Sequence, residues 1–147
     1  MTMSLQEISD RLEINDLLIS YCTAVDSDDI DRFDEIFTPD AIIDYSVFGF
    51  DRAGLEATKQ FLKESLPAVP GKQHMIANSE VHLDGDRATA RTLCFNPMVV
   101  PRDGGGFQMM YFHLWYQDKL LRTDKGWRIS ERVEEKSHVF TADGVIS

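Results

Sequence analysis

Helix gives way to strand within one stretch of this sequence, YCTAVDSDDIDRFDEIFTPDAIIDY, which runs from Tyr21 to Tyr45. Tyr21 and Asp26 stand at the end of an amphipathic run, and Tyr45 ends a short apolar one. A surface helix needs neither a tyrosine nor a carboxylate on its core-facing side. These polar groups therefore need a partner from elsewhere in the chain, and His74 in the segment KQHMIAN is the best candidate.

Length and composition indicate one soluble domain covering residues 1–147. The chain has 147 residues, of which 43% are hydrophobic and 27% charged, and such values are ordinary for a globular protein. No apolar run approaches the roughly 18 residues of a membrane span. The first residues lack the basic and apolar regions of a signal peptide. We therefore expect a cytoplasmic protein.

Charge and cysteine content exclude several classes of function. The net charge of −10 repels phosphate backbones and anionic lipids, so we expect neither nucleic acid nor a membrane as a partner. Two cysteines, Cys22 and Cys94, are too few for a disulfide framework or a structural zinc site. Their apolar neighbours indicate buried thiols.

Hydrophobic periodicity predicts three helices with one short early strand, followed by four long strands. The first helix begins at a capping box formed by Ser4 and Glu7, and the other two cover residues 30–37 and 54–66. The core-facing stripe of the first helix is predicted to contain Leu5, Ile8, Leu12, Leu17 or Leu18, Tyr21, Cys22 and Val25. The predicted strands are 41–48, 73–83, 87–100, 107–123 and 127–140, with tight turns at 84–86 and 124–126.

These elements predict an α+β fold with an internal cavity. Long strands joined by tight turns are antiparallel, and helices gathered on one face of such a sheet make an α+β domain. Residues 107–123 would extend more than about 40 Å at ~3.3 Å per residue, too far for the sheet to stay flat. A curved antiparallel (mixed) sheet closed by three N-terminal helices encloses a cavity.

Asp26 and His74 each have a structural and a chemical interpretation. Five residues separate Tyr21 from Asp26, about 140° on an unbroken helix, so both can face one cavity only if the helix ends near Asp26. Alternatively, Asp26 caps the second helix. His74 lies near the start of a strand, where histidine is commonly structural. A carboxylate at one ring nitrogen would fix its tautomer and raise the basicity of the other nitrogen.

The strand at 107–123 divides into two alternating sets of side chains. His113 belongs to the first set, with Met109, Tyr111, Trp115 and Gln117, and it either lines the pocket or packs at the strand face or a subunit contact. The second set includes Phe112, Leu114 and Tyr116. We expect this second set on the outer face, buried in a two-fold homodimer.

Several familiar chemistries lack their motifs in this sequence. It has no HExxH or comparable ligand spacing, no G-x-S-x-G elbow and no phosphate-binding glycine loop. We therefore expect neither a metal ion nor a cofactor.

Four stretches resemble the SnoaL-like family of the nuclear transport factor 2-like superfamily, which includes scytalone dehydratase and bile-acid 7α-dehydratase. They are the stretch from Tyr21 to Tyr45, KQHMIAN, DGDRATA and YQDKLLRTDKGWRISER. The resemblance implies a cone-shaped α+β fold. It also implies that Asp26 supports a catalytic His74, with Tyr21 and Tyr45 matching tyrosines of the bile-acid and scytalone enzymes respectively.

Other positions carry over less directly. Arg132 matches an arginine in the last strand of the bile-acid enzyme. Asn96 or Met98 stands where scytalone dehydratase has a second catalytic histidine, and His113 comes from the next strand. A reaction that needs two histidines therefore does not carry over, and we expect Asn96, Met98, His113 and Arg132 to contact substrate instead.

The combined expectation is a cofactor-free lyase or isomerase acting on a small hydrophobic oxygenated ring. His74 would take a proton next to a carbonyl, Asp26 would stabilise the imidazolium, and the two tyrosines would bind the carbonyl oxygen. His74 could return the proton to a leaving hydroxyl, and isomerisation or cyclisation would use the same groups. The alternative is a non-catalytic module that binds a ligand or another chain.

Overall fold

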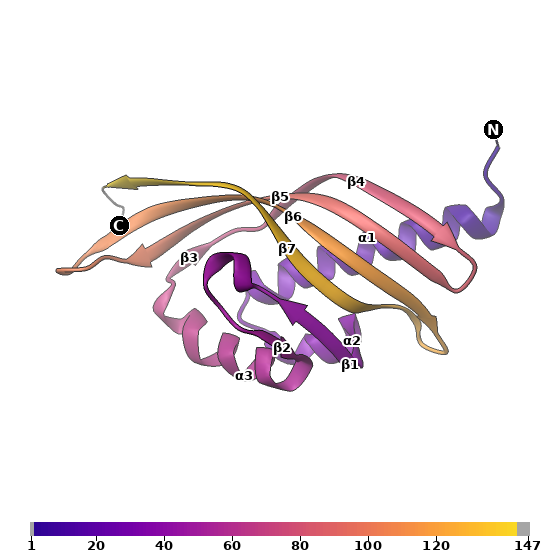
Figure 1. The fold of residues 1–147 in the computed structure, drawn as a ribbon, viewed down its shortest axis with the longest axis horizontal. Coiled ribbons are helices and arrows are strands. Elements are labelled where there is room, and N and C mark those ends of the chain that lie inside the picture. The colour runs from indigo at the N-terminus through magenta and orange to yellow at the C-terminus, as the bar shows by residue number, and fades with distance from the viewer. Residues whose placement is uncertain (1, 144–147) are drawn as a thin grey trace.

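The computed structural model describes residues 2–143 and shows a large sheet with helices on one of its faces (Figure 1). The α-helices are α1 (Leu5–Asp26), α2 (Phe33–Ile36) and α3 (Leu55–Ser65). The 3₁₀ helices are η1 (Ile30–Arg32), η2 (Ser46–Phe48) and η3 (Leu66–Ala68). The strands are β1 (Phe37–Asp44), β2 (Arg52–Gly54), β3 (Gly71–Lys72), β4 (Met75–Asp84), β5 (Arg87–Pro101), β6 (Phe107–Thr123) and β7 (Gly126–Asp143).

Across residues 2–143, seven strands form one mixed sheet in the order β2-β1-β7-β6-β5-β3, with β4 also paired to β5. Strands β1 and β7 are parallel, whereas the other pairs are antiparallel. Gly85 (φ 59°) and Gly126 (φ 92°) adopt the left-handed conformation that the two predicted hairpin turns require. The predicted α+β fold with a curved mixed sheet is confirmed.

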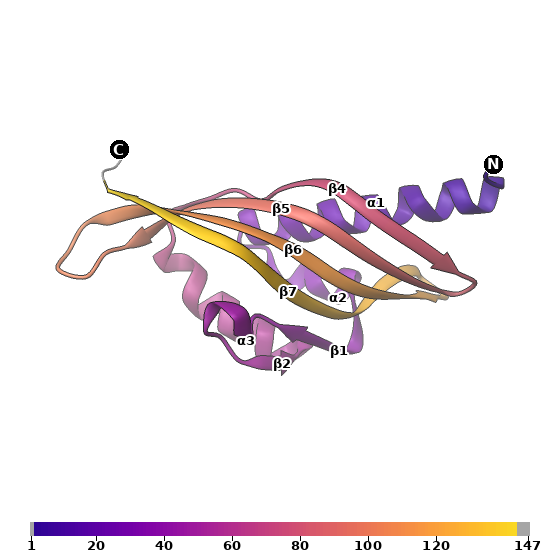
Figure 2. The same ribbon diagram turned by 45° about the horizontal axis from the view of Figure 1, so that its top comes forward.

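The long strands β4 to β7 form one curved layer (Figures 1 and 2). In both views α1 runs behind these strands, and α3 lies beneath them next to β1 and β2. Helix α1 contacts β4 and β7, and α3 contacts β1. Between these layers lies a core that includes Ile14, Phe33, Leu120 and Ile129. The helices thus cover one face of the sheet.

The first half of α1 packs differently from the prediction, although its capping box at Ser4 is confirmed. Leu5, Ile8 and Leu12 are exposed, so their assignment to the core is wrong. Asp10 is buried in this half instead, because its carboxylate binds the Arg122 guanidinium at 2.6 and 2.7 Å. The buried hydrophobic stripe of α1 starts at Ile14.

The predicted second helix is shorter than expected. It divides into η1 and α2, and Phe37 already belongs to β1, opposite Ile129 of β7. Strand β1 therefore includes Pro39. This proline, which has no backbone N–H, lies where the β1–β7 pairing is irregular, so no regular ladder hydrogen bond is lost. The predicted strand at 41–48 ends at Asp44, because residues 46–48 form η2. The third predicted helix corresponds to α3.

A bulge in β4 interrupts the alternation of its side chains. Asn78 has φ 35°, and the pairing with β5 shifts between Ala77 and Ser79. A one-residue shift exchanges the two faces of a strand. Ile76 and Val81 consequently both pack against the core, although an unbroken alternation would put residues five apart on opposite faces.

The two faces of β6 are the reverse of the expected ones. Leu114 and Tyr116 are buried beneath the helices, and Phe112 packs against the same core. The outer-face assignment of these three residues is therefore wrong. Period-two alternation separates two sets of residues but does not say which set faces inward, and both sets in β6 are rich in aromatic side chains.

Candidate functional site

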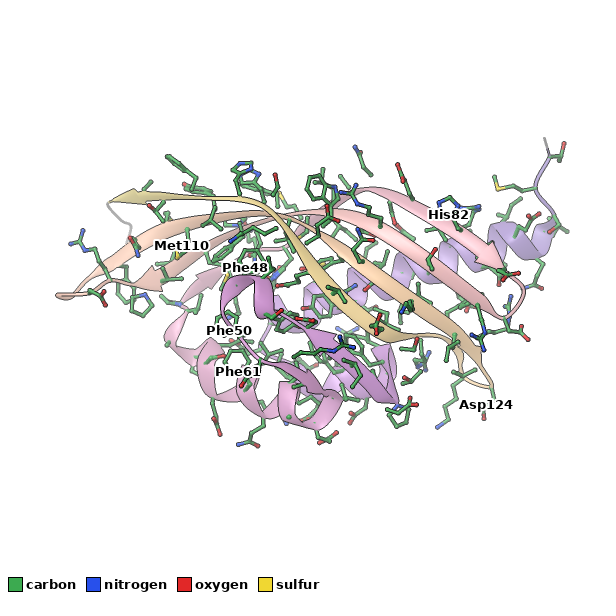
Figure 3. All side chains as sticks on the ribbon, in the orientation of Figure 1. Phe48, Phe50, Phe61, His82, Met110 and Asp124 are labelled. Carbon is green, nitrogen blue, oxygen red and sulfur yellow. The ribbon has the colours of Figure 1, made fainter. Side chains whose placement is uncertain are left out.

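A cavity of about 340 Å³ lies between the helices and the sheet. Helices α1 and α3 form one wall, and strands β5, β6 and β7 form the other. Much of its lining is aromatic: the Phe50 and Phe61 rings lie 5.0 Å apart, and the Phe48 and Phe112 rings 5.2 Å apart. Figure 3 shows Phe48, Phe50 and Phe61 together on the helical side of the sheet. Such a site suits a small apolar molecule.

Asp26 and His74 form a hydrogen-bonded pair beside this cavity. Helix α1 ends at Asp26, as predicted, and His74 occupies the gap between β3 and β4. Asp26 Oδ1 lies 2.6 Å from His74 Nδ1, and Asp26 Oδ2 accepts the backbone N–H of His74 at 2.9 Å. The alternative role of Asp26 as a cap is wrong, because Asp29 precedes η1.

The pairing fixes the chemistry of the two ring nitrogens of His74. An ionised carboxylate can only accept hydrogen bonds, so Nδ1 carries a proton and Nε2 presents its lone pair. Asn96 Nδ2 lies 3.0 Å from Nε2 and donates to it. Asn96 Oδ1 is buried without a partner in the part of the chain that the structure describes. After a half-turn of the amide, this oxygen could accept a hydrogen bond from the imidazolium N–H.

Tyr21 and Tyr45 place two hydroxyl groups in the cavity wall, 2.7 Å apart. The Tyr21 ring also meets the His74 ring edge-on at 6.4 Å. Burial raises the pKa of Tyr21 well above its ordinary value, and burial followed by the charge of Glu134 raises the pKa of Tyr45. Both hydroxyls therefore remain protonated hydrogen-bond donors at neutral pH.

Arg132 lies behind this tyrosine pair and not in the cavity wall. Its guanidinium is fully buried, with its centre 4.0 Å from the ring centres of both Tyr21 and Tyr116. Two hydrogen bonds of 2.7 Å join it to the buried carboxylate of Asp118. Arg132 therefore supports Tyr21 from the core side.

Glu134 is a cavity residue that sequence reasoning missed. Its partly buried side chain lines the cavity from β7. Burial is the main cause that raises the pKa of this carboxyl to about 8. A signal was available in the sequence, because residues two apart in a strand share a face and Arg132 was already expected to point inward.

The whole fold matches a known family and known structures. Residues 6–133 match the SnoaL-like domain. This protein belongs to the SnoaL-like domain family. The "uncharacterized protein Rv2910c" of Mycobacterium tuberculosis is 46% identical to this SnoaL-like chain over 134 residues, which are 91% of this chain and 90% of that protein. The predicted family membership is confirmed.

Two solved structures show how widely this fold is shared. A Novosphingobium aromaticivorans protein provisionally assigned as a scytalone dehydratase has a TM-score of 0.83 at 15% identity, covering 97% of this chain and 94% of its own. A type 2 hexachlorocyclohexane dehydrochlorinase has a TM-score of 0.84 at 19% identity, covering 96% of this chain and 94% of its own. At such identities the likeness concerns the fold.

In the SnoaL-like chain, six of the eight expected site residues line the cavity or adjoin it directly. Tyr21, Tyr45, His74, Asn96 and Met98 are in its wall, and Asp26 holds His74. His113 lies elsewhere: its ring stacks on His138 at 4.0 Å and meets Phe95 at 4.8 Å on the opposite face of the sheet. His113 and the buried Arg132 are therefore not positioned to contact a molecule in the cavity.

The rest of the structure adds few candidates. A wider hollow of about 500 Å³ adjoins Asp26 on its other side, and its wall contains Asp28 and Lys72, which form an ion pair of 2.9 Å. Among residues 2–143, no three His, Cys, Asp or Glu side chains converge in a way that could hold a metal ion. No helix in the same range is both long and apolar enough to cross a bilayer. Cys22 and Cys94 are buried free thiols, as predicted.

Proposed function

We propose that this SnoaL-like protein is a cofactor-free lyase or isomerase of the dehydratase kind. Its substrate would be a small hydrophobic ring that carries a carbonyl and a second oxygen. The 2.6 Å contact between Asp26 Oδ1 and His74 Nδ1 carries this proposal, because it leaves Nε2 as a base in the wall of an apolar cavity. The names dehydratase and dehydrochlorinase of two structural neighbours agree with this class.

The proposed reaction starts with proton abstraction by His74. Nε2 takes a proton from the carbon next to the carbonyl, and the charge of Asp26 stabilises the imidazolium that forms. The hydrogen bond to Asn96 must be released as the substrate binds. General-base catalysis of this kind contributes roughly 10²–10⁴-fold, and holding the substrate in place adds to it.

The tyrosine pair would stabilise the charge that develops on the carbonyl oxygen. One hydroxyl of the Tyr21–Tyr45 pair donates to the other, so one O–H remains free to donate to an oxyanion. The guanidinium of Arg132 has its centre 4.0 Å from the Tyr21 ring centre, and its positive charge favours a negatively charged substrate oxygen at the tyrosine pair. When His74 forms an enolate, the neutral hydroxyl donors of the tyrosine pair would therefore bind its oxygen.

A turnover screen tests the proposed class. The screen uses cyclic β-hydroxy ketones and cyclic enones, with Asp26→Asn and His74→Ala as paired variants. We expect turnover by the wild type and loss of at least about 100-fold in kcat for each variant. Wild-type rates in both variants would contradict the proposal.

One observation favours a second candidate, a module that binds a ligand without turnover. The Asn96 amide occupies the lone pair of His74 Nε2 at 3.0 Å, as it would in a purely structural histidine. A ligand that binds tightly and is recovered unchanged, with the same affinity in His74→Ala, would favour this module. Loss of turnover with retained binding would favour the enzyme.

We also infer that two copies associate through the outer face of the sheet. On this face the Tyr111 ring stacks on Phe95 at 6.1 Å and meets Phe140 at 5.9 Å, and the Phe140 side chain is 60% exposed. Burying such aromatic surface favours a two-fold dimer. Sedimentation velocity should show a dimer that Phe140→Glu weakens, and a monomer at all concentrations would contradict this.

A further inference from the structure

One carboxyl group in the cavity wall has no role in the reaction proposed above. Glu134 lines the cavity, yet within residues 2–143 its carboxyl oxygens form no hydrogen bond or ion pair. The side chain is partly buried, and a carboxyl in an apolar wall without a partner is favoured in its neutral form. Its position therefore needs an explanation.

The strand register places Glu134 between two tyrosines. Tyr116 lies directly across from it in β6. On the other side, Asp44 of β1 lies beside Val133, so Tyr45 follows next to Glu134. The Glu134 side chain therefore lines the same cavity as the Tyr21–Tyr45 hydroxyl pair, and the edge-on Tyr21 ring links this pair to His74. Base, hydroxyl pair and carboxyl thus follow one another along a single cavity wall.

The surrounding charges favour a neutral Glu134. The ionisable groups that interact electrostatically with its carboxyl include Tyr21 of α1, Asp44 and Tyr45 at the end of β1, Cys94 of β5, Tyr116 and Asp118 of β6, and Arg132 of β7. Arg132 is the cation of this set, and its charge lowers the pKa of Glu134, but the effect of burial is larger. Burial then dominates and holds the pKa of Glu134 near 8, so the carboxyl keeps its proton at neutral pH.

We propose that Glu134 is the general acid that complements the His74 base, donating its proton to the hydroxyl that leaves from a cyclic β-hydroxy ketone. This inference rests on the proposed function and extends it. The carbonyl and the β-hydroxyl of such a substrate are separated by a short carbon chain. The tyrosine pair can therefore bind the carbonyl oxygen while Glu134, in the same cavity wall, donates its proton to the β-hydroxyl.

The proposed step balances without any other reactant. His74 Nε2 takes the proton of the carbon next to the carbonyl, and the electron pair of that bond forms the enolate. The enolate electrons then form the carbon–carbon double bond as the C–O bond breaks, and the departing oxygen takes the Glu134 proton to leave as water. The products are an enone and water, and the imidazolium returns its proton to Glu134 through solvent.

The kinetic test compares kcat against pH for the wild type, Glu134→Gln and Glu134→Asp with a β-hydroxycyclohexanone, followed by the absorbance of the enone. Wild-type kcat should fall as pH rises through about 8, because Glu134 then loses its proton. The nearby thiols cannot cause this decline, since burial raises the pKa of Cys22 to about 11 and that of Cys94 to about 12.

Glu134→Gln should lower kcat about 100-fold and remove its decline at alkaline pH. Glu134→Asp should retain part of the wild-type kcat and part of this decline. A Gln variant with the wild-type rate and the wild-type decline would overturn the role of Glu134. His74→Ala tests the underlying function separately. If His74→Ala keeps its rate while Glu134→Gln loses it, the base is wrong and the proton donor stands.

A stability measurement tests the protonated carboxyl without any substrate. An unfolded glutamate loses its proton near 4.5, whereas folded Glu134 keeps it up to about 8. Wild-type stability should therefore decrease across this interval, because the folded state binds one proton more than the unfolded state. The Tm of Glu134→Gln should rise relative to wild type from pH 5 to pH 9. A Tm difference that does not change with pH would overturn the proposal.

Discussion

Asp26 holds His74 with both oxygens of its carboxylate: Oδ1 lies 2.6 Å from the ring nitrogen Nδ1, and Oδ2 accepts the backbone N–H at 2.9 Å. The second hydrogen bond fixes the main chain of His74 where β3 has ended and β4 has not begun. The first fixes the ring. One carboxylate at the end of α1 thus sets both the position and the tautomer of a residue 48 positions later.

Asp26→Asn should separate these two functions. The amide oxygen can still accept one hydrogen bond, but the amide nitrogen offers a donor in place of the negative charge, so the imidazole loses its support as a base. We expect kcat to fall by about 10²–10⁴-fold with the fold unchanged, as measured by steady-state kinetics and circular dichroism. Asp28→Asn, at the neighbouring ion pair with Lys72, is the matched control. Equal losses in both variants would contradict the assignment.

Tyr45→Phe should remove one hydroxyl of the oxyanion-binding pair. We expect kcat to fall by about 10²–10³-fold with a small change in KM, because the hydrogen bond is needed most when charge develops. Tyr116→Phe is the matched control, since this buried hydroxyl contacts Cys94 Sγ at 3.5 Å and lies outside the cavity wall. If the control loses as much activity, the effect belongs to packing and the role of Tyr45 fails.

Asp118→Asn should mainly affect stability. The change leaves the fully buried guanidinium of Arg132 without its counter-charge, and breaking such a pair from one side costs about 3–5 kcal/mol. Urea denaturation should show this loss in the free energy of unfolding. Asp31→Asn, at the exposed pair with Lys63, should change stability little. An equal loss in the free energy of unfolding at both sites would contradict a particular contribution of the buried pair to stability.

Asp10 predicts how stability responds to acid. Hydrogen bonds from Arg122 are the largest cause that lowers the pKa of Asp10 below its ordinary value of 3.8. The unfolded state therefore binds a proton at a higher pH than the folded state does. The stabilisation is present above the ordinary value and is lost as pH falls below it. The Tm difference between wild type and Asp10→Asn should be largest near neutral pH and should shrink towards about pH 2. A difference that grows in acid would contradict this.

Local signals predicted most of the fold. The capping box at Ser4, the end of α1 at Asp26 and both hairpin turns depend on a few neighbouring residues, and each is found where the sequence indicated. Failures occurred where a choice between faces was needed. Leu5 and Leu12 are exposed, and Phe112 faces inward, because period and spacing define a face without saying what will cover it.

The candidate site shows the same division. The sequence predicted the kinds of side chain in this site: an aspartate after a helix, a histidine before a strand and two tyrosines. Glu134 could not be told apart from Glu131 and Glu135 of the same strand, because clustered acidic residues are typical of a solvated face. Glu135 does face outward and binds Arg91, whereas Glu134 faces the cavity.

The sequence by itself determined the main helices and the long strands of this protein, their order and the family to which it belongs, because periodicity, caps and turns act over a few residues. Only the tertiary structure decided that Asp26 meets His74, that Tyr21 meets Tyr45 and that Glu134 lines the same cavity with no hydrogen-bond partner among residues 2–143. These contacts depend on strand register, on the bulge at Asn78 and on which face of the sheet the helices cover. A burial environment that keeps a carboxyl neutral exists only once those long-range contacts have formed.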